Sequence, residues 1–481
     1  MDLVKPLQTE TSATHLNPPQ IALIGLGLIS GLLYFFNFRI KDFFLQSQLV
    51  GKSAIHFYVF LFAILSALYL IGIYLIFKYR SRERHSNALS MIILIFALGF
   101  RASLISADPA VLSKDMYRYI WDGRIQQNGI NPYLYPPDAE QLNKLRDDKV
   151  YPNINRKPYR TLYPAGAQLF FRLLHMIAGD SVIGYKALMT LFDLLTLFVL
   201  MALLRTYGFE KTRLFIYAWN PLVIFEIAYS GHLEGITVFF MVLAFYLNAT
   251  NKNLLGVVAL AISSATKLYP AIFLPTLLNP GQRVKGILCF TLAIVLLYVP
   301  FLTAGSKVSG FLPIYLQNPD ESFNLGIKYF MMKMLPQLNY YLLSKVFLLA
   351  VTAVGLFIFF KNKQKHQVLW YAYLLTGLLM VLMPASLHAW YLIILIPFLS
   401  FYPAVAWLFF SIAVTLSYLK YVSPAGIMPK GVLMLEYGPL FTLLAGGYML
   451  NRYAHRNQEN MISHGPRRRY FLERISGAKY E

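Results

Sequence analysis

The stretch from Ser113 to Tyr135, SKDMYRYIWDGRIQQNGINPYLY, places acidic, basic and aromatic side chains together directly after an apolar run that ends near Ser106. If the chain is helical from Asp115 onwards, Asp115, Arg118 and Asp122 share one face, at positions i, i+3 and i+7. Two carboxylates with a guanidinium between them form a polar site. The alternative is a solvated helix at a membrane surface, whose ion pairs only orient the loop.

The composition excludes an ordinary soluble protein. Of the 481 residues, 57% are hydrophobic and 14% are charged, and the mean hydropathy is +0.52. These values predict an all-α, polytopic membrane protein. The net charge of +21 comes from short basic clusters between apolar runs, as the positive-inside rule produces, so we expect no nucleic-acid partner. The single cysteine, Cys289, leaves no disulfide framework.

About twelve apolar runs are long enough to cross a bilayer, at roughly 17 to 25 residues each. They lie near residues 20–37, 56–78, 88–106, 182–204, 212–230, 233–249, 286–303, 341–360, 367–385, 387–402, 404–420 and 432–450. The N-terminus lacks the basic region and the cleavage site of a signal peptide, so we expect the first run to remain as a span.

Basic clusters predict the orientation, because Lys and Arg concentrate on the cytoplasmic side. These clusters are Lys78, Arg80, Arg82 and Arg84; Arg205, Lys211 and Arg213; Arg283 and Lys285; Lys361, Lys363 and Lys365; and a tail with Arg467, Arg468 and Arg469. We expect a cytoplasmic N-terminus at residues 1–19, a single transmembrane domain at residues 20–451 and a basic cytoplasmic tail at residues 452–481. Two large loops, about residues 107–181 and 303–340, are then extracytoplasmic. We expect the basic residues of the tail to reflect the orientation of the protein in the membrane rather than a role in binding anionic lipid.

Two segments depart from simple crossings. Residues 254–278 suit a re-entrant hairpin with its apex near Thr266, Lys267 and Pro270, which keeps every basic cluster inside and directs Lys267 into a cavity. An ordinary span with a lysine reaching to the surface is the alternative. In the first outer loop, prolines interrupt helices, while Ala165 to Ala178 alternates on a helical period and predicts an interfacial helix.

An ordered set of segments carries a family resemblance. DMYRYIWDGR, then GINPYLYPPDA, then LYPAGAQLFF resembles the first large extracytoplasmic loop of the bacterial polyprenol-phosphate-mannose-dependent mannosyltransferases, which belong to the GT-C superfamily of integral-membrane glycosyltransferases. The resemblance covers most of the chain from about Ala107 to Leu399 and leaves the first two spans unexplained. It implies a GT-C fold and an extracytoplasmic active site in the inner membrane.

The resemblance implies a role for Asp115 as the base that deprotonates the acceptor hydroxyl, because an aspartate at this place is the proposed base of the superfamily. Inverting glycosyl transfer needs such a base, and the departing phosphate needs positive charge or hydrogen-bond donors. The same loop supplies further expected substrate-binding residues, namely Arg118, Asp122, Arg124 and Tyr163. Asp122 could bind a sugar hydroxyl or hold Arg118.

Lys267 and His388 are the candidates for stabilising the leaving phosphate. The stretch MPASLHAWYLIILIP resembles the family's proline, histidine, tryptophan, tyrosine signature, whose histidine contacts the donor phosphate. Trp390 and Tyr391 suit a sugar face. An aromatic belt at the membrane surface explains these two residues equally well, but it explains His388 less well.

The stretch WNPLVIFEIAYSGHLEG is a third cluster, and it resembles the family's glycine, histidine, any residue, acid pattern with Glu234 as the acid. Glu226, His232 and Glu234 are ionisable groups within or beside spans, which makes them functional candidates. Asp193 is expected to find a buried donor within the bundle. Asn324, in PDESFNLGIKYF, loosely matches a family motif and is expected to contact sugar.

These features predict an inverting transferase that moves a hexose, mannose by resemblance, from a polyprenyl-phosphate donor to a glycolipid, glycan or protein acceptor. Two rival functions remain open: a transporter or flippase of lipid-linked sugar, and a polymerase or ligase that uses a pyrophosphate-linked donor. No cofactor is expected, and a divalent metal stays an open alternative because His232 and Glu234 offer only two ligands. The chain has no P-loop, GxGxxG or GxSxG, which argues against direct use of a nucleotide.

Overall fold

The computed structural model describes residues 16–46, 52–79, 83–107, 112–313, 323–423 and 426–462, and this part of the chain is helical with no strand. Its first half contains α1 (Pro18–Gln46), α2 (Lys52–Lys78), α3 (Glu83–Ile105), α4 (Asp115–Gln127), α5 (Ala165–Ala178), α6 (Val182–Thr206), α7 (Phe215–Ala218), α8 (Pro221–Ile224), α9 (Glu234–Ala249) and α10 (Asn253–Thr266). Its second half contains α11 (Leu274–Leu277), α12 (Arg283–Tyr298), α14 (Ile327–Met334), α15 (Tyr340–Phe360), α16 (Lys365–Val381), α17 (Ile396–Leu399), α18 (Val405–Ala413) and α19 (Lys430–Ile462).

Within the described residues, eight helical stretches are long and apolar enough to cross a membrane, which confirms the prediction of an all-α membrane protein. They are Pro18–Phe36, Ala54–Lys78, Asn87–Ile105, Val182–Thr206, Pro280–Ser309, Tyr340–Phe360, Val405–Val422 and Lys430–Leu450. Four shorter apolar helices, Ala165–Ala178, Glu234–Ala249, Asn253–Thr266 and Ala389–Leu399, lie among them. The number of twelve crossings remains a prediction.

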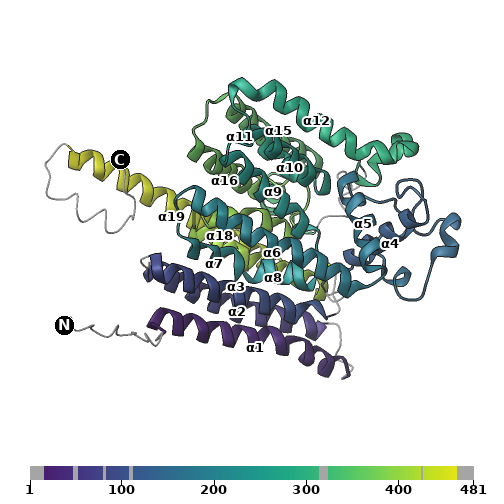
Figure 1. Cartoon of the computed structure of the whole chain (residues 1–481), viewed down its shortest axis with the longest axis horizontal. Helices are drawn as coiled ribbons and strands as arrows, with labels where there is room; N and C mark the ends of the chain where they lie inside the picture. The colour runs from purple at the N-terminus through teal and green to yellow at the C-terminus, as the bar shows by residue number, and fades with distance from the viewer. Residues whose placement is uncertain are drawn as a thin grey trace, which may run out of the picture.

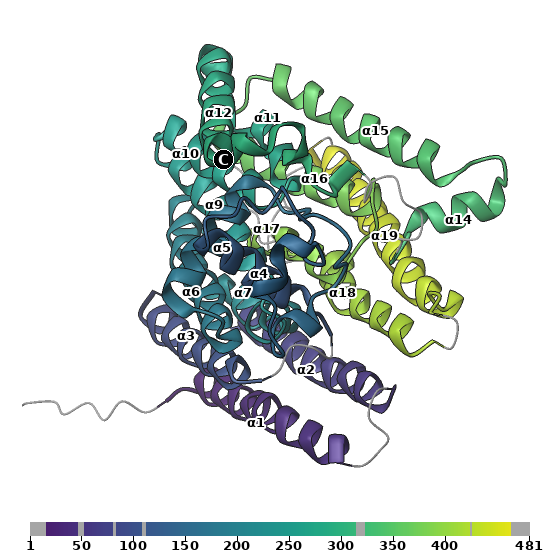
Figure 2. The ribbon, with the colours of Figure 1, turned by 90° about the vertical axis from the view of Figure 1, so that its right-hand side faces the viewer.

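The helices run roughly side by side, and α4 and α5 cap one end of the bundle (Figure 1). The first turn of α1 and the last turn of α19 lie at the opposite end (Figure 1). Viewed onto the cap, α4 lies over the middle of the molecule, with the other helices arranged around it (Figure 2). The predicted basic residues Arg80 and Arg82, the chain before residue 16 and the tail with Arg467 to Arg469 lie outside the described residues.

The apolar run at residues 212–230 is a chain of short helices rather than one straight span. It breaks at Asn220, whose side-chain oxygen accepts hydrogen bonds from the backbone N–H groups of Leu222 and Val223, at 3.0 and 3.4 Å. Pro221 follows as the first residue of α8, where its missing N–H costs nothing. The chain then continues as a π-helical segment, Phe225–Tyr229. Almost every residue of this run is buried, so the run forms the interior of the bundle.

Residues 253–277 turn back on themselves. The Asn248 amide donates to the Asn253 side chain at 3.2 Å and to the Leu277 carbonyl at 3.3 Å, so the two ends of this segment lie together. Between them, α10 ends at Thr266 and a 3₁₀ turn, Tyr269–Phe273, leads into α11. Lys267, the residue after α10, therefore lies at the end of this segment that is away from Asn248.

A buried ion pair joins α3 to α6. Arg101 Nε lies 2.5 Å from Asp193 Oδ2, and both side chains are fully buried. The Tyr217 hydroxyl donates to Asp193 Oδ1 at 2.7 Å, and Arg101 Nη1 donates to the carbonyl of Ala218 at 2.8 Å. The expectation that Asp193 finds a buried donor is confirmed, and its main partner is Arg101.

Replacing Asp193 with Ala should destabilise the protein by about 3–5 kcal/mol, because the Arg101 charge would stay buried without its carboxylate. The measurement is the thermal unfolding midpoint of the purified protein in detergent. The double variant Arg101→Met, Asp193→Leu should recover most of the loss, because it removes both charges. An Asp193→Ala protein as stable as the wild type would contradict this role for the pair.

Candidate active site

Asp115 is the first residue of α4, at the cap of the bundle. Its backbone N–H donates to Ser113 Oγ at 3.2 Å, and its carboxylate accepts a hydrogen bond from Asn155 Nδ2 at 2.7 Å. The position of α4 depends on Gly123, where a Cβ atom would lie 2.5 Å from the Phe171 carbonyl oxygen in α5. The Asp115 side chain keeps 19% of its surface exposed, so a ligand can reach it.

The surroundings of Asp115 favour the carboxylate form. Burial alone would raise the pKa of Asp115, but the charges of His232, Lys267 and Arg156 and the hydrogen bond from Asn155 together hold it below its usual value. A carboxylate at the first turn of a helix is also stabilised by the helix dipole. Asp115 is thus ionised at neutral pH and can accept a proton.

His232 lies between two carboxylates. Its Nδ1 is 3.9 Å from Asp115 Oδ2, and its Nε2 is 3.3 Å from Glu226 Oε2. Both His232 and Glu226 are buried, and the other oxygen of Glu226 accepts a short hydrogen bond from the Tyr418 hydroxyl. The turn that carries His232 requires a glycine, because Gly231 has φ +71° and its Cα lies against the Met116 side chain of α4.

Glu234 and Lys267 form a second ion pair at this end of the bundle. Lys267 Nζ lies 2.7 Å from Glu234 Oε1, which also accepts a hydrogen bond from the Tyr269 hydroxyl at 2.9 Å. Lys267 Nζ is 5.3 Å from the centre of the Tyr391 ring, on its face. Glu234 is fully buried, whereas 11% of the Lys267 side chain is exposed.

Four stacked rings run through the site, and we call them the ring column: His232, Trp390, His388 and Phe323. Their successive ring centres are 4.0, 4.4 and 4.8 Å apart, and successive planes are within 20° of parallel. Tyr391 contacts the His388 ring edge to face at 5.4 Å. His388, Trp390 and Tyr391 therefore join Asp115, His232, Glu234 and Lys267 in one cluster.

The other predicted residues of the loop that contains α4 and α5 form ion pairs within that loop. Arg118 Nε donates to Asp122 Oδ1 at 2.9 Å, and the fully buried Asp122 also accepts from Gln168. Arg124 bridges Asp147 and Asp180, at 2.7 and 3.0 Å. We therefore assign Arg118, Asp122 and Arg124 to supporting α4.

Tyr163 packs its ring edge against Tyr119 and Phe171, with 7% of its surface exposed. Burial, and next the Asp115 charge, raises the pKa of Tyr163, so its hydroxyl stays protonated close to the carboxylate.

Asn324 is fully buried, and its expected sugar contact stays a prediction. Its Nδ2 donates to Glu436 at 2.6 Å, its Oδ1 accepts from Gly326 N–H, and its carbonyl accepts from Leu387 N–H. Asn324 thus connects the loop at about residues 303–340 to the segment before His388. Part of that loop, residues 314–322, lies outside the described residues.

Residues that the sequence analysis passed over complete the site. Asn155 and Arg156 come from an irregular stretch between α4 and α5, where no periodic pattern distinguishes one polar residue from another. Arg156 has φ +50°, a backbone conformation that is unusual outside glycine and often found at functional sites. Tyr418 lies 192 residues from its partner Glu226, which no local pattern could reveal.

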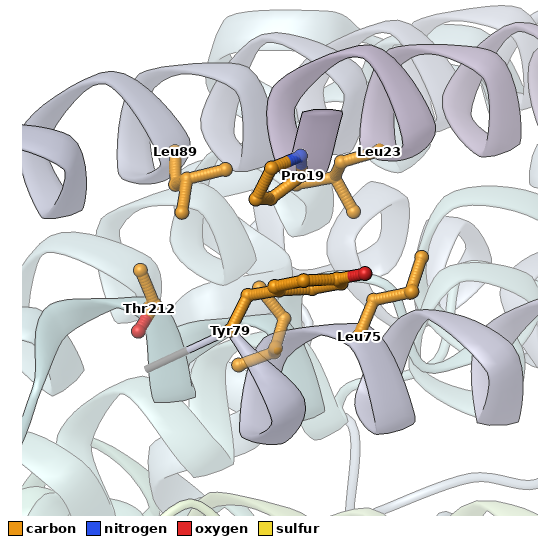
Figure 3. A pocket seen from close by; sticks show the side chains of 7 residues that line it. Pro19, Leu23, Leu75, Tyr79, Leu89 and Thr212 are labelled. Atoms are coloured by element: carbon orange, nitrogen blue, oxygen red, sulfur yellow. The ribbon is translucent and has the colours of Figure 1, made fainter. Parts of the chain in front are cut away.

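The described ranges contain no group of three or more His, Cys, Asp or Glu side chains arranged to hold a metal ion. A small pocket lies far from the cluster, where α1 begins and α2 ends. Pro19, Leu23, Leu75, Tyr79, Leu89 and Thr212 line it, and apart from Thr212 and the Tyr79 hydroxyl their side chains are apolar (Figure 3).

The long apolar helices bury ion pairs, and acids, bases and stacked rings lie together at one end. These features are typical of an all-α integral-membrane enzyme. Residues 36–279, slightly more than half of the chain, match the family model described as alpha-(1->6)-mannopyranosyltransferase, N-terminal domain, and the chain belongs to that family. Among curated proteins it is similar to alpha-(1->6)-mannopyranosyltransferase A of Mycobacterium tuberculosis, with 27% identity over 226 residues. That match covers 44% of this chain and 42% of the relative.

Acid should loosen the first outer loop through Arg124. Burial would raise the pKa of Asp147, but hydrogen bonds from Arg124 and from the backbone of Tyr151 and Val150 lower it to about 2. A depressed carboxyl pKa stabilises the fold above the unfolded value near 4, and this contribution is lost as the pH falls towards 2. We expect faster proteolysis of residues 140–153 at pH 3 than at pH 6, measured by mass spectrometry.

Arg124→Leu should loosen the same loop at pH 6 and remove most of the difference between the two pH values. Arg146→Leu is the control, because Arg146 donates to the carbonyls of Pro137 and Ala139, which do not titrate. Its effect should be the same at both pH values. An Arg124→Leu protein that keeps the full pH response would refute this explanation.

Proposed function

We propose that this protein is an inverting glycosyltransferase that moves a hexose, mannose in this proposal, from a polyprenyl-phosphate donor to an extracytoplasmic glycolipid, glycan or protein. The observation that carries the proposal is Asp115, an ionised and partly exposed carboxylate held by Asn155 beside the charges of Lys267 and Arg156. Membership of a family named for mannopyranosyl transfer supports the sugar.

In this mechanism Asp115 removes the proton from the acceptor hydroxyl as its oxygen attacks the anomeric carbon. The bond from that carbon to the phosphate oxygen breaks, and its electron pair leaves with the lipid phosphate. General-base catalysis of this kind requires a carboxylate that is ionised and within reach of the hydroxyl. The exposed part of Asp115 and the direction of its pKa shift both suit that role.

The leaving phosphate gains negative charge, which the cations near Asp115 can stabilise. Arg156 and Lys267 are the candidate cations, because both charges act on Asp115, and His388 is a candidate as a neutral hydrogen-bond donor. Lys267 is already paired with Glu234, so part of its charge is offset. We therefore assign phosphate binding to Arg156 together with Lys267 and His388, and we assign Trp390 and Tyr391 to the sugar.

The proposed topology places this site outside the inner membrane and both termini in the cytoplasm, with about twelve crossings and a re-entrant hairpin at residues 253–277. Support comes from the start of α1 and the end of α19, which both lie at the end of the bundle away from α4 (Figure 1). Support for the hairpin comes from Asn248, which binds both of its ends.

Two other functions fit less well. A transporter of lipid-linked sugar would be expected to place its polar site near the membrane midplane between repeated halves, whereas here His232 and Lys267 lie close to Asp115, at the end that α4 caps. A ligase that uses a pyrophosphate-linked donor would be expected to carry paired arginines in the late outer loop, where this sequence has only scattered lysines.

Asp115→Asn should lower the rate of sugar transfer by about 10²–10⁴-fold, because the amide cannot accept the proton. The measurement uses purified protein in lipid vesicles, radiolabelled polyprenyl-phosphate mannose and membrane-extract acceptors. Donor binding and thermal stability, measured alongside, should stay close to the wild-type values. If both proteins transfer label equally, Asp115 is not the base. If neither transfers label but labelled donor crosses the bilayer, the transporter function replaces this proposal.

Arg156→Ala should raise the apparent KM for the donor by about 10-fold with a smaller effect on kcat, as expected for the loss of a phosphate contact. Lys157→Ala is the matched control. Lys157 is the next residue in the same loop, but its Nζ donates to the Pro152 carbonyl and lies over the Tyr151 ring. Equal KM values for the two variants would remove Arg156 from the phosphate site.

A further inference from the structure

Glu226 and Tyr418 are buried polar groups for which the mechanism above has no use. Glu226 is 1% exposed and Tyr418 is 4% exposed, and they belong to segments far apart in the chain. Burying a carboxylate in an apolar bundle is costly, and a lone acid at such a depth is a sign of function. Glu226 also lies in the π-helical segment, a geometry that is frequent at functional sites.

The contacts of Glu226 form a chain that leads to Asp115. The Tyr418 hydroxyl donates to Glu226 Oε1, Glu226 Oε2 lies 3.3 Å from His232 Nε2, and His232 Nδ1 lies 3.9 Å from Asp115 Oδ2. Both His232 nitrogens are buried and make no conventional hydrogen bond. The two carboxylates thus lie on opposite sides of the imidazole, one beside each ring nitrogen.

The backbone and the ring column fix His232 in this position. Its N–H donates to the Glu226 carbonyl at 2.9 Å, and Gly231 N–H donates to the Ile227 carbonyl at 3.1 Å, so the π-helical segment ends in a capped turn. The imidazole stacks on Trp390, with ring centres 4.0 Å apart. His232 therefore cannot swing away from either carboxylate without breaking this stack.

We propose that Glu226 and Tyr418 are positioning residues, which hold His232 beside Asp115 so that the imidazole favours the carboxylate form of Asp115 that catalysis needs. The interaction between His232 and Asp115 is electrostatic, because 3.9 Å is too long for a hydrogen bond. This inference rests on the proposed function only for its catalytic consequence. The ionisation of Asp115 itself can be tested without any transfer activity.

Other charges also act at this place and stay unchanged in the test. The titratable and charged groups around Asp115 and His232 are Lys267, Arg156, Glu234, His388, Tyr119, Tyr163 and Tyr421. Because Lys267 and Arg156 remain in place, a weaker interaction with His232 should raise the pKa of Asp115 only partly.

The test compares Glu226→Gln and Tyr418→Phe with the wild type. Each protein is treated over a range of pH with a carbodiimide, a reagent for protonated carboxyl groups, and the labelling of Asp115 is measured by mass spectrometry. Removing the Glu226 charge weakens the contact that holds His232 in place, and Asp115 then loses part of its favourable interaction with His232. We expect the midpoint of labelling to move to higher pH by about one unit in Glu226→Gln and by less in Tyr418→Phe. Tyr217→Phe is the control, since Tyr217 also donates to a buried carboxylate, Asp193, but in another cluster.

The second measurement is the pH profile of sugar transfer by the same proteins. The acidic limb should move to higher pH in step with the labelling, with the donor KM unchanged. Unchanged labelling in both variants overturns the inference even if transfer proceeds. If the labelling midpoint shifts in the variants but the wild-type protein transfers no sugar, the effect of Glu226 and Tyr418 on Asp115 is supported and the proposed function is refuted. Glu226→Gln keeps the size of the side chain, and Tyr418→Phe provides an independent variant if Glu226→Gln does not fold.

Discussion

The structure depends on one constraint: an ionised side chain inside an apolar bundle must have a partner of opposite charge or a set of hydrogen-bond donors. Arg101, near the end of α3, and Asp193, midway through α6, satisfy this constraint with no surface exposed. At the cap, Lys267 satisfies Glu234, and Tyr418 and His232 satisfy Glu226. Arg101 and Asp193 are 92 residues apart and Tyr418 and Glu226 are 192 apart, so these two pairs fix which distant segments become neighbours. Asp115 differs from them because its own partners leave part of the carboxylate exposed.

The cap shows how the constraint leads to a site. Arg118 and Arg124 are turned inwards, onto Asp122, Asp147 and Asp180, and they hold the loop in place. The consequence is that α4 is buried along nearly all of its length, while its first residue, Asp115, stays accessible. A helix held this firmly can present one carboxylate without moving when a ligand arrives, which reduces the cost of binding.

Sequence patterns predicted most of the fold, because lipid-facing helices are read directly from apolar length. They also predicted the helix that begins at Asp115, the helix from Ala165 to Ala178 and the internal donor for Asp193. They failed at residues 212–230, where hydropathy alone cannot distinguish a lipid-facing span from a buried broken helix. They also missed Asn155, Arg156 and Tyr418, since contacts between irregular or distant segments leave no periodic signal. Family similarity covers residues 36–279 and so includes Asp115, His232 and Lys267, but Phe323, His388, Trp390 and Tyr418 come from beyond it.

The separation of Glu226 from Tyr418 has a consequence for biosynthesis. The two residues are 192 positions apart, and a ribosome adds roughly 5 to 20 residues per second. Tyr418, the phenolic donor, is therefore synthesised on the order of 10 to 40 seconds after Glu226. The ring column is delayed in the same way, because His232 is made long before Trp390 and His388. The segment from Asn220 to Glu234 thus has to enter the membrane before it can be packed, so the site forms late in assembly, when the last helices close over an interior already in place.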